Sequence, residues 1–223
     1  MEQPDSSQEN FNSNQPTYTD KEVFTQIWFS PRKIFRFIND TWYENHMIPL
    51  LCLAGIARAF DNAYSGHMGN TMSLLGIMCL CIIGGGLFGW IWVYLYSALI
   101  AWTGKWFKGQ GDAQSIMRVM AYASIPTITT LILFLIQIII YGNSLFQSDL
   151  PLLDSDNTSI IIANLFSLIK ICLGLWTVVL SVVGISEVQK ISIGEAILNL
   201  ITAGAMIIVP IIILVVVFII ATK

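Results

Sequence analysis

Lys170 stands inside an apolar run, residues 160–185, that is long enough to cross a bilayer. An ammonium at that depth costs from ~2.5 to more than 10 kcal/mol unless partners, water or snorkelling compensate its charge. Small and polar residues recur at steps of three or four around it, which places them on one helical face. This stripe consists of Ala163, Ser167, Lys170, Gly174, Thr177, Ser181 and Gly184. We therefore expect the stripe to contact other helices rather than lipid.

Two interpretations of Lys170 are open. In the structural one, the ammonium snorkels to the membrane surface or is held by hydroxyls and backbone carbonyls. In the functional one, it belongs to an interior polar site that binds a ligand or a lipid headgroup. Pro126 adds a similar choice, since the Ser and Thr residues around it either repair a proline kink or form a small polar site. The candidate interior site comprises Tyr122, Ser124, Thr130 and Gln137 of one segment, and Ser167, Lys170 and Thr177 of the next.

Composition identifies the class of protein. With 55% hydrophobic and 11% charged residues, the chain is predicted to be an integral membrane protein. A net charge of −3 argues against nucleic acid as a partner. The four cysteines lie in apolar segments and are interpreted as small core residues. No zinc-protease or serine-elbow pattern occurs, so we expect no enzyme activity, no bound metal and no cofactor.

Five apolar segments predict an all-α bundle of five membrane-spanning helices, over residues 47–60, 72–102, 117–141, 160–185 and 196–221. The first is short and ends in Arg58, so a re-entrant segment is the alternative. The positive charges favour five crossings. In that arrangement one side holds Lys21, Arg32, Lys33, Arg36, Lys105, Lys108, Arg118 and Lys190, and the other holds only Lys223. The N-terminus is then cytoplasmic and the C-terminus lies outside, with an Arg58–Asp61 ion pair at the outer rim.

The N-terminal region divides into a polar, disordered cytoplasmic tail (1–20) and a basic amphipathic interfacial helix (21–43), followed by the membrane domain (44–223). Ser30 and Pro31 are typical of a helix start. Arg32, Lys33 and Arg36 form a basic face, for which we expect contact with anionic lipid headgroups. The alternative, compatible with the first, is a helix packed on the cytoplasmic ends of the bundle.

Glycines in the membrane segments predict close helix packing. Gly85 and Gly89 are four residues apart in the second apolar segment, and Gly174 lies in the stripe of Lys170. The run of Gly84, Gly85 and Gly86 superficially resembles a phosphate loop, but no strand precedes it. We therefore assign these glycines to helix contact.

Four stretches together resemble the Yip1 family of five-span membrane proteins. They are SPRKIFRFI at 30–38, the glycine-rich second segment followed by LIAWTGK at 99–105, AYASIP at 121–126, and IGEA at 193–196. The resemblance covers the chain from about residue 30 onward. It implies the five-span fold, and eukaryotic relatives act in trafficking from the endoplasmic reticulum to the Golgi and contact Rab-type small GTPases through a long N-terminal region. This chain has a short tail and short loops, which is typical of a prokaryotic relative in a bacterial inner membrane and does not favour GTPase binding.

Two functions follow as hypotheses. The first is a non-enzymatic bundle, alone or in a homo- or hetero-oligomer, that organises membrane or recruits partners. The second is a transporter or channel for small solutes, ions or lipids, with Lys170, Gln137 and the hydroxyls near Pro126 along a polar path.

The charge distribution predicts which loops face outward. Cysteines placed at 143–159 should react with an impermeant reagent on intact cells, whereas cysteines placed at 105–114 should react only after the membrane is opened. Labelling of the 105–114 loop from outside would overturn this topology.

Overall fold

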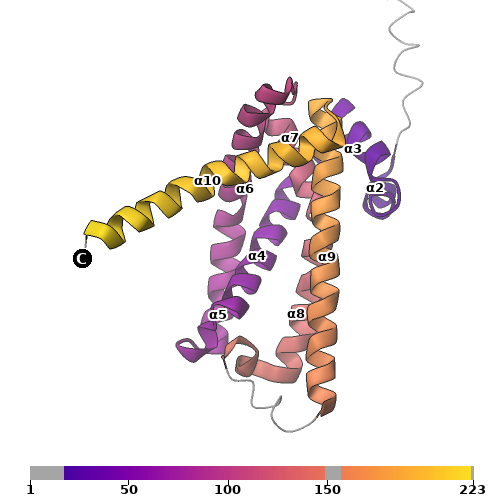
Figure 1. The fold of residues 1–223 in the computed structure, drawn as a ribbon. Helices are drawn as coiled ribbons and strands as arrows, with labels where there is room; N and C mark the ends of the chain where they lie inside the picture. The colour runs from indigo at the N-terminus through magenta and orange to yellow at the C-terminus, as the bar shows by residue number, and fades with distance from the viewer. Residues whose placement is uncertain (1–17, 149–156, 222–223) are drawn as a thin grey trace, which may run out of the picture.

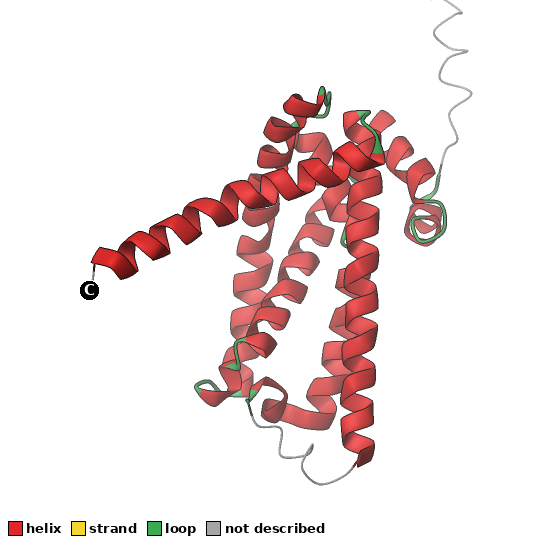
Figure 2. Cartoon of the chain, in the orientation of Figure 1, coloured by secondary structure: helices red, strands yellow, loops and turns green. Residues whose placement is uncertain are grey.

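A computed structural model describes residues 18–148 and 157–221 of the chain, and these residues form helices, turns and loops without a strand (Figure 2). Residues 1–17, most of the predicted tail, lie outside the described residues. The helices are α2 (Asp20–Gln26), α3 (Pro31–Asp40), α4 (Met47–Ser65), η1 (Met68–Asn70), α5 (Leu74–Cys79), the π-helix η2 (Leu80–Gly85), α6 (Gly86–Gly104), η3 (Lys105–Phe107), α7 (Ala113–Ala123), α8 (Ile125–Tyr141), η4 (Gly142–Phe146), α9 (Asn157–Gln189) and α10 (Ile193–Ala221).

Four helical stretches of the described chain are long and apolar enough to cross a membrane: Leu74–Phe107, Ala113–Phe146, Ile160–Gln189 and Ile193–Ala221. They confirm the prediction of an all-helical, multi-pass membrane protein. The predicted first span is not among them. It forms α4, which has 19 residues and carries Arg58 and Asp61 near its end, and this charge lowers its apolarity below that of the other four.

The helices form a bundle in which α4 packs against α6 and α8, and α8 packs against α9 (Figure 1). One end, here called the basic end, holds α3, η3 and the end of α9 with Lys190. The opposite end holds η1 and η4. Near the basic end α7 packs between α6 and α9, and α10 crosses both α9 and α6 before its C-terminal half extends away from the bundle (Figure 1).

A proline divides the predicted third span into α7 and α8. Pro126 lies in the first turn of α8, where its missing N–H costs nothing. The Ser124 hydroxyl donates to the carbonyls of Met120 and Ala121, at 2.8 Å each. The Met120 carbonyl also accepts the backbone N–H of Ser124 at 3.1 Å, so the hydroxyl adds to the backbone bonds at the end of α7.

The segment expected as one helix over 21–43 forms α2 and α3, separated by residues 27–30. Ser30 is the N-cap of α3 and Pro31 its first residue, although the serine hydroxyl makes no capping bond. On α3, Ile34, Phe35 and Ile38 are completely buried, and the helix packs on α7 and α9. The apolar face of α3 therefore contacts protein, and its basic face points outward.

Glycines bring α4 into backbone contact with the η2–α6 helix. A Cβ added to Gly55 would lie 2.2 Å from the carbonyl oxygen of Gly85 and 2.7 Å from the Cα of Gly89. Gly174 differs from the expectation, because a Cβ there would meet nothing within 4 Å. The tight position on α9 is Gly184, whose Cβ would lie 2.2 Å from a methyl group of Val119. Helix α9 thus approaches its neighbours most closely near the basic end.

The cysteines also differ from the expectation. Cys81 is buried, but Cys79 and Cys172 are exposed on the bundle surface and Cys52 is half-buried. Being in an apolar segment therefore did not imply a place in the protein core, since the outer faces of such helices suit lipid equally well.

Alanine substitutions should separate the two kinds of glycine. Gly89→Ala places a methyl group against the Gly55 backbone and should lower the free energy of unfolding by about 1–3 kcal/mol. Gly174→Ala meets open space and should raise it by roughly 0.5–1 kcal/mol, through helix propensity alone. Unfolding of the purified protein in a neutral detergent measures both, and a shift in the same direction for both variants would contradict the assignment.

Candidate functional site

Lys170 lies between α9 and the aromatic side chains of α8 and α4. Its Nζ is 3.6 Å from the ring centroid of Phe134 and 4.9 Å from that of Tyr64. Asp61 acts on it electrostatically but forms no ion pair with it. Ring faces attract a cation by about 0.5–2 kcal/mol, more when water is excluded. The rings thus offset part of the cost of burying the Lys170 charge. The predicted ion pair between Arg58 and Asp61 does not form among the described residues.

The predicted hydroxyls do not gather around Lys170. Ser167 and Thr177 donate to carbonyls one turn earlier on α9, and Ser124 and Thr130 donate to carbonyls of α7 and α8. Thr177 also shares a 2.8 Å hydrogen bond with Thr127, which links α9 to α8. Each hydroxyl therefore has a partner inside the protein, as an apolar environment requires.

The remaining two predicted site residues occupy separate places. Gln137 is buried one turn from Phe134, and its Oε1 has no hydrogen-bond partner among the described residues. Tyr122 is buried at the basic end, where its hydroxyl accepts a 3.4 Å hydrogen bond from the backbone N–H of His46. Lys170 and Gln137 therefore belong to the same region around Phe134, and Tyr122 does not.

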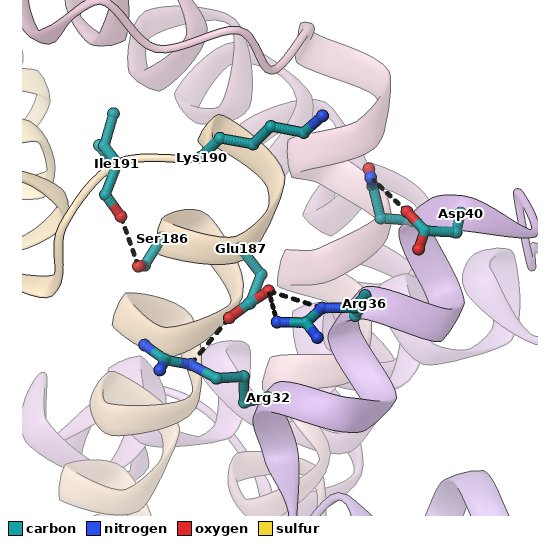
Figure 3. Close-up of a pocket in the computed structure, with 8 residues that line it drawn as sticks. Arg32, Arg36, Asp40, Ser186, Glu187, Lys190 and Ile191 are labelled. Carbon is teal, nitrogen blue, oxygen red and sulfur yellow. Dashed lines mark hydrogen bonds and ion pairs between the residues drawn. The ribbon is translucent and has the colours of Figure 1, made fainter.

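At the basic end, two of the three predicted surface residues pair with a carboxylate of α9. Arg32 Nε lies 2.7 Å from one Glu187 oxygen, and Arg36 donates to the other from Nε at 3.3 Å and Nη2 at 3.2 Å (Figure 3). Lys33 is exposed. Glu187 was not singled out in the sequence, although an acidic residue near the end of a long apolar run is a usable signal for such a partner.

Arg32, Arg36 and Glu187 line a pocket of about 440 Å³ between α3 and the end of α9 (Figure 3). Asn39, Asp40, Ser186, Lys190 and Ile191 complete its wall. The guanidinium edges not used by Glu187 and the Lys190 ammonium give it hydrogen-bond donors, so polar or anionic groups suit it better than apolar ones.

Arg118 of α7 forms a buried polar cluster that the sequence did not predict. The charge count places it on the basic side of the membrane, and its side chain is completely buried there. Its Nη2 lies 2.7 Å from the Glu44 carboxylate, and its Cζ is 4.8 Å from the centre of the Trp42 ring. Gln114 also donates to Glu44. This cluster ties the connection between α3 and α4 to α7.

A second buried polar cluster, which the sequence did not predict either, joins α6, α9 and α10. The side chains of Gln189 and Asn199 both donate to the Ile100 carbonyl, at 3.1 and 3.2 Å, and Thr103 donates to Asn199 at 2.5 Å. All three side chains are fully buried. Gln189 also lies directly against the backbone of Gly104, so the small residue of the LIAWTGK stretch makes room for an amide from another helix.

Comparison with known proteins identifies the family. The Yip1 domain matches residues 25–221, which includes every cluster above. The chain belongs to the Yip1 family. No curated protein and no solved structure matches the chain.

The Yip1 family is not a known enzyme family. In the described part of this Yip1 domain, no three His, Cys, Asp or Glu side chains are grouped so that they could hold a metal ion. The polar clusters instead join helices: Arg118 joins the α3–α4 connection to α7, Glu187 joins α9 to α3, and Gln189 joins α9 to α6.

The Arg118–Glu44 pair predicts unequal effects of removing its two members. Glu44→Ala leaves a completely buried guanidinium without its carboxylate and should destabilise the protein by roughly 2–4 kcal/mol, discounted because Glu44 is 39% exposed. Arg118→Met should cost less, because water can solvate the remaining carboxylate. Chemical unfolding of both variants tests this, and a larger loss for Arg118→Met would contradict it.

The same pair gives a pH dependence. The Arg118 hydrogen bond holds the pKa of Glu44 below its ordinary value of 4.5. Above pH 4.5 the ionised carboxylate therefore contributes to the stability of the folded protein. This contribution is lost as the pH falls through the lower pKa that Glu44 has in the folded state. Part of the acid destabilisation of the wild type should be missing in Arg118→Met, which serves as the control.

Proposed function

We propose that this Yip1-family protein is a non-enzymatic membrane protein that organises membrane or recruits partners through its basic end. The observation that carries the proposal is the attachment of α3: its apolar face is buried in the bundle, and Arg32 and Arg36 are held by Glu187. A helix fixed in this way presents a basic face at a constant position. That suits contact with an anionic surface better than movement of a solute through the bundle.

The proposed topology has five crossings with the basic end in the cytoplasm. Helix α4 supports it, because 19 residues rise roughly 28 Å, close to the thickness of the hydrocarbon core. It also runs beside α6 and α8 from the basic end to the η1 and η4 end (Figure 1). Its Arg58 and Asp61 then lie near the outer surface, where charge is tolerated.

The proposed partners are anionic headgroups of the inner leaflet, and further copies of this chain or other membrane proteins. Each basic residue near an anionic leaflet contributes about 1 kcal/mol of attraction. A trafficking-like role, as in eukaryotic relatives, fits the same surface, whereas small-GTPase binding is not proposed. The bacterial inner membrane is the proposed location.

Transport is the alternative function, and Lys170 is the observation that favours it. It is a half-buried cation with aromatic neighbours and no ion-pair partner among the described residues. Intramembrane charges often mark a path for ions or substrates. Against this, the nearby hydroxyls are bonded within the protein.

A flux experiment distinguishes the two functions. Liposomes containing the full-length protein should move neither small anions nor labelled phospholipid faster than protein-free liposomes, because the hydroxyls near Lys170 are bonded within the protein. Flux that Lys170→Met abolishes and Lys105→Met retains would establish transport and contradict the proposed function. Lys105 is a suitable control, since it is an exposed lysine at the basic end.

A further inference from the structure

The pocket between α3 and α9 lies where a membrane span ends. Ser186 and Glu187 of α9, with Lys190 directly after the helix, surround the end of the candidate span Ile160–Gln189. That span has 30 residues, or roughly 45 Å of helix, against a hydrocarbon core of about 30 Å. In the proposed topology this surplus length lets the last turn of α9, and the pocket beside it, reach the headgroup layer.

The pocket has unused donors. Arg32 engages Glu187 through Nε alone, so both of its Nη groups keep their N–H bonds free of the described residues. Arg36 uses Nε and Nη2, which leaves Nη1. Glu187 is only 13% exposed and fixes the direction of both guanidinium groups. A carboxylate in this role orients the arginines rather than occupying all their donors.

Lys190 completes the arrangement from the other side. It directly follows α9 in the left-handed conformation, with φ 55°, and its side chain extends away from Glu187 toward the side of the pocket that holds Asp40 (Figure 3). Its ammonium makes no hydrogen bond or ion pair with the described residues. Three cations and two carboxylates, Glu187 and Asp40, thus line the pocket, which gives it a net charge of +1.

We infer that this pocket binds a phosphate group, with Lys190 and the free edges of Arg32 and Arg36 as donors. Planar guanidinium edges and an ammonium are the side chains that bind phosphate oxygens most strongly. Lipid headgroups and soluble phosphate esters share this chemistry, and the level of the pocket at the end of α9 favours the phosphate of an inner-leaflet lipid. The inference rests on the proposed cytoplasmic placement of the basic end and adds a specific site to the general surface contact.

The test substitutes Lys190, because changing either arginine would also break its ion pair with Glu187 and disturb α3. Lys190→Asn removes the charge and keeps a residue that tolerates positive φ. Lys108→Asn is a matched control: Lys108 is also an exposed lysine at the basic end, has φ 60°, and does not line the pocket. Thermal unfolding without added lipid should be the same for both variants, which verifies that each is folded.

Binding is measured by calorimetry on the full-length protein in a neutral detergent, with three probes. They are short-chain phosphatidylglycerol, glycerol phosphate, and a diacylglycerol of the same chain length without phosphate. Phosphatidylglycerol should bind the wild type and Lys108→Asn equally, and Lys190→Asn about tenfold more weakly, as expected for one lost charge-assisted bond. The diacylglycerol should show no dependence on Lys190.

The probes also separate the sources of the phosphate. If glycerol phosphate binds with the same dependence on Lys190, the site takes a soluble phosphate ester, and if only the lipid does, it takes a headgroup. Equal affinity of all three proteins for phosphatidylglycerol, equal weakening by both substitutions, or no binding to the wild type would overturn the inference. The flux experiment is independent of these results, so transport could be established while the phosphate site stands.

Discussion

The completely buried guanidinium of Arg118 is the constraint on which the basic end depends. A charge without solvent requires a charged or strongly polar partner, and the structure provides Glu44 at 2.7 Å and the face of Trp42. Both partners come from the short connection between α3 and α4. Satisfying one charge on α7 therefore fixes where α3 ends and α4 begins. The positions of Arg32, Arg36 and the pocket follow from that, because they lie on the helix held by this connection.

Much of the fold could be predicted from patterns within single segments. Apolar runs identified the four candidate spans, Ser30 and Pro31 marked the start of α3, and Pro126 lies where α7 gives way to α8. Such signals are local, because backbone geometry and the length of an apolar run depend on neighbouring residues in the sequence. For α4 the same signal was weak, since its length suffices but its charges reduce its apolarity.

The candidate site was harder to predict, because the sequence of one helix does not show which residues of another helix it contacts. The stripe on α9 predicted that Lys170 faces other helices, but not that it would meet the rings of Phe134 and Tyr64 rather than hydroxyls. Nor could it tell that the close contact lies at Gly184 and not at Gly174, two equivalent positions by spacing. The burial of Arg118 could not be predicted for a related reason: counting charges assigns a side of the membrane but not a degree of burial.

Burial of the apolar face of α3 changes how this protein can contact a membrane. An interfacial helix usually inserts that face among the lipids, but here Ile34, Phe35 and Ile38 already pack in the bundle. The exposed face of α3 itself is basic, so the attraction of this helix to the leaflet is electrostatic and weakened by salt. A specific headgroup pocket is one way to add selectivity to such a contact, because fixed guanidinium groups distinguish a phosphate by geometry as well as by charge. Glu187 then has two roles that require each other: it holds α3 on α9, and in doing so it orients the donors that face the headgroup layer.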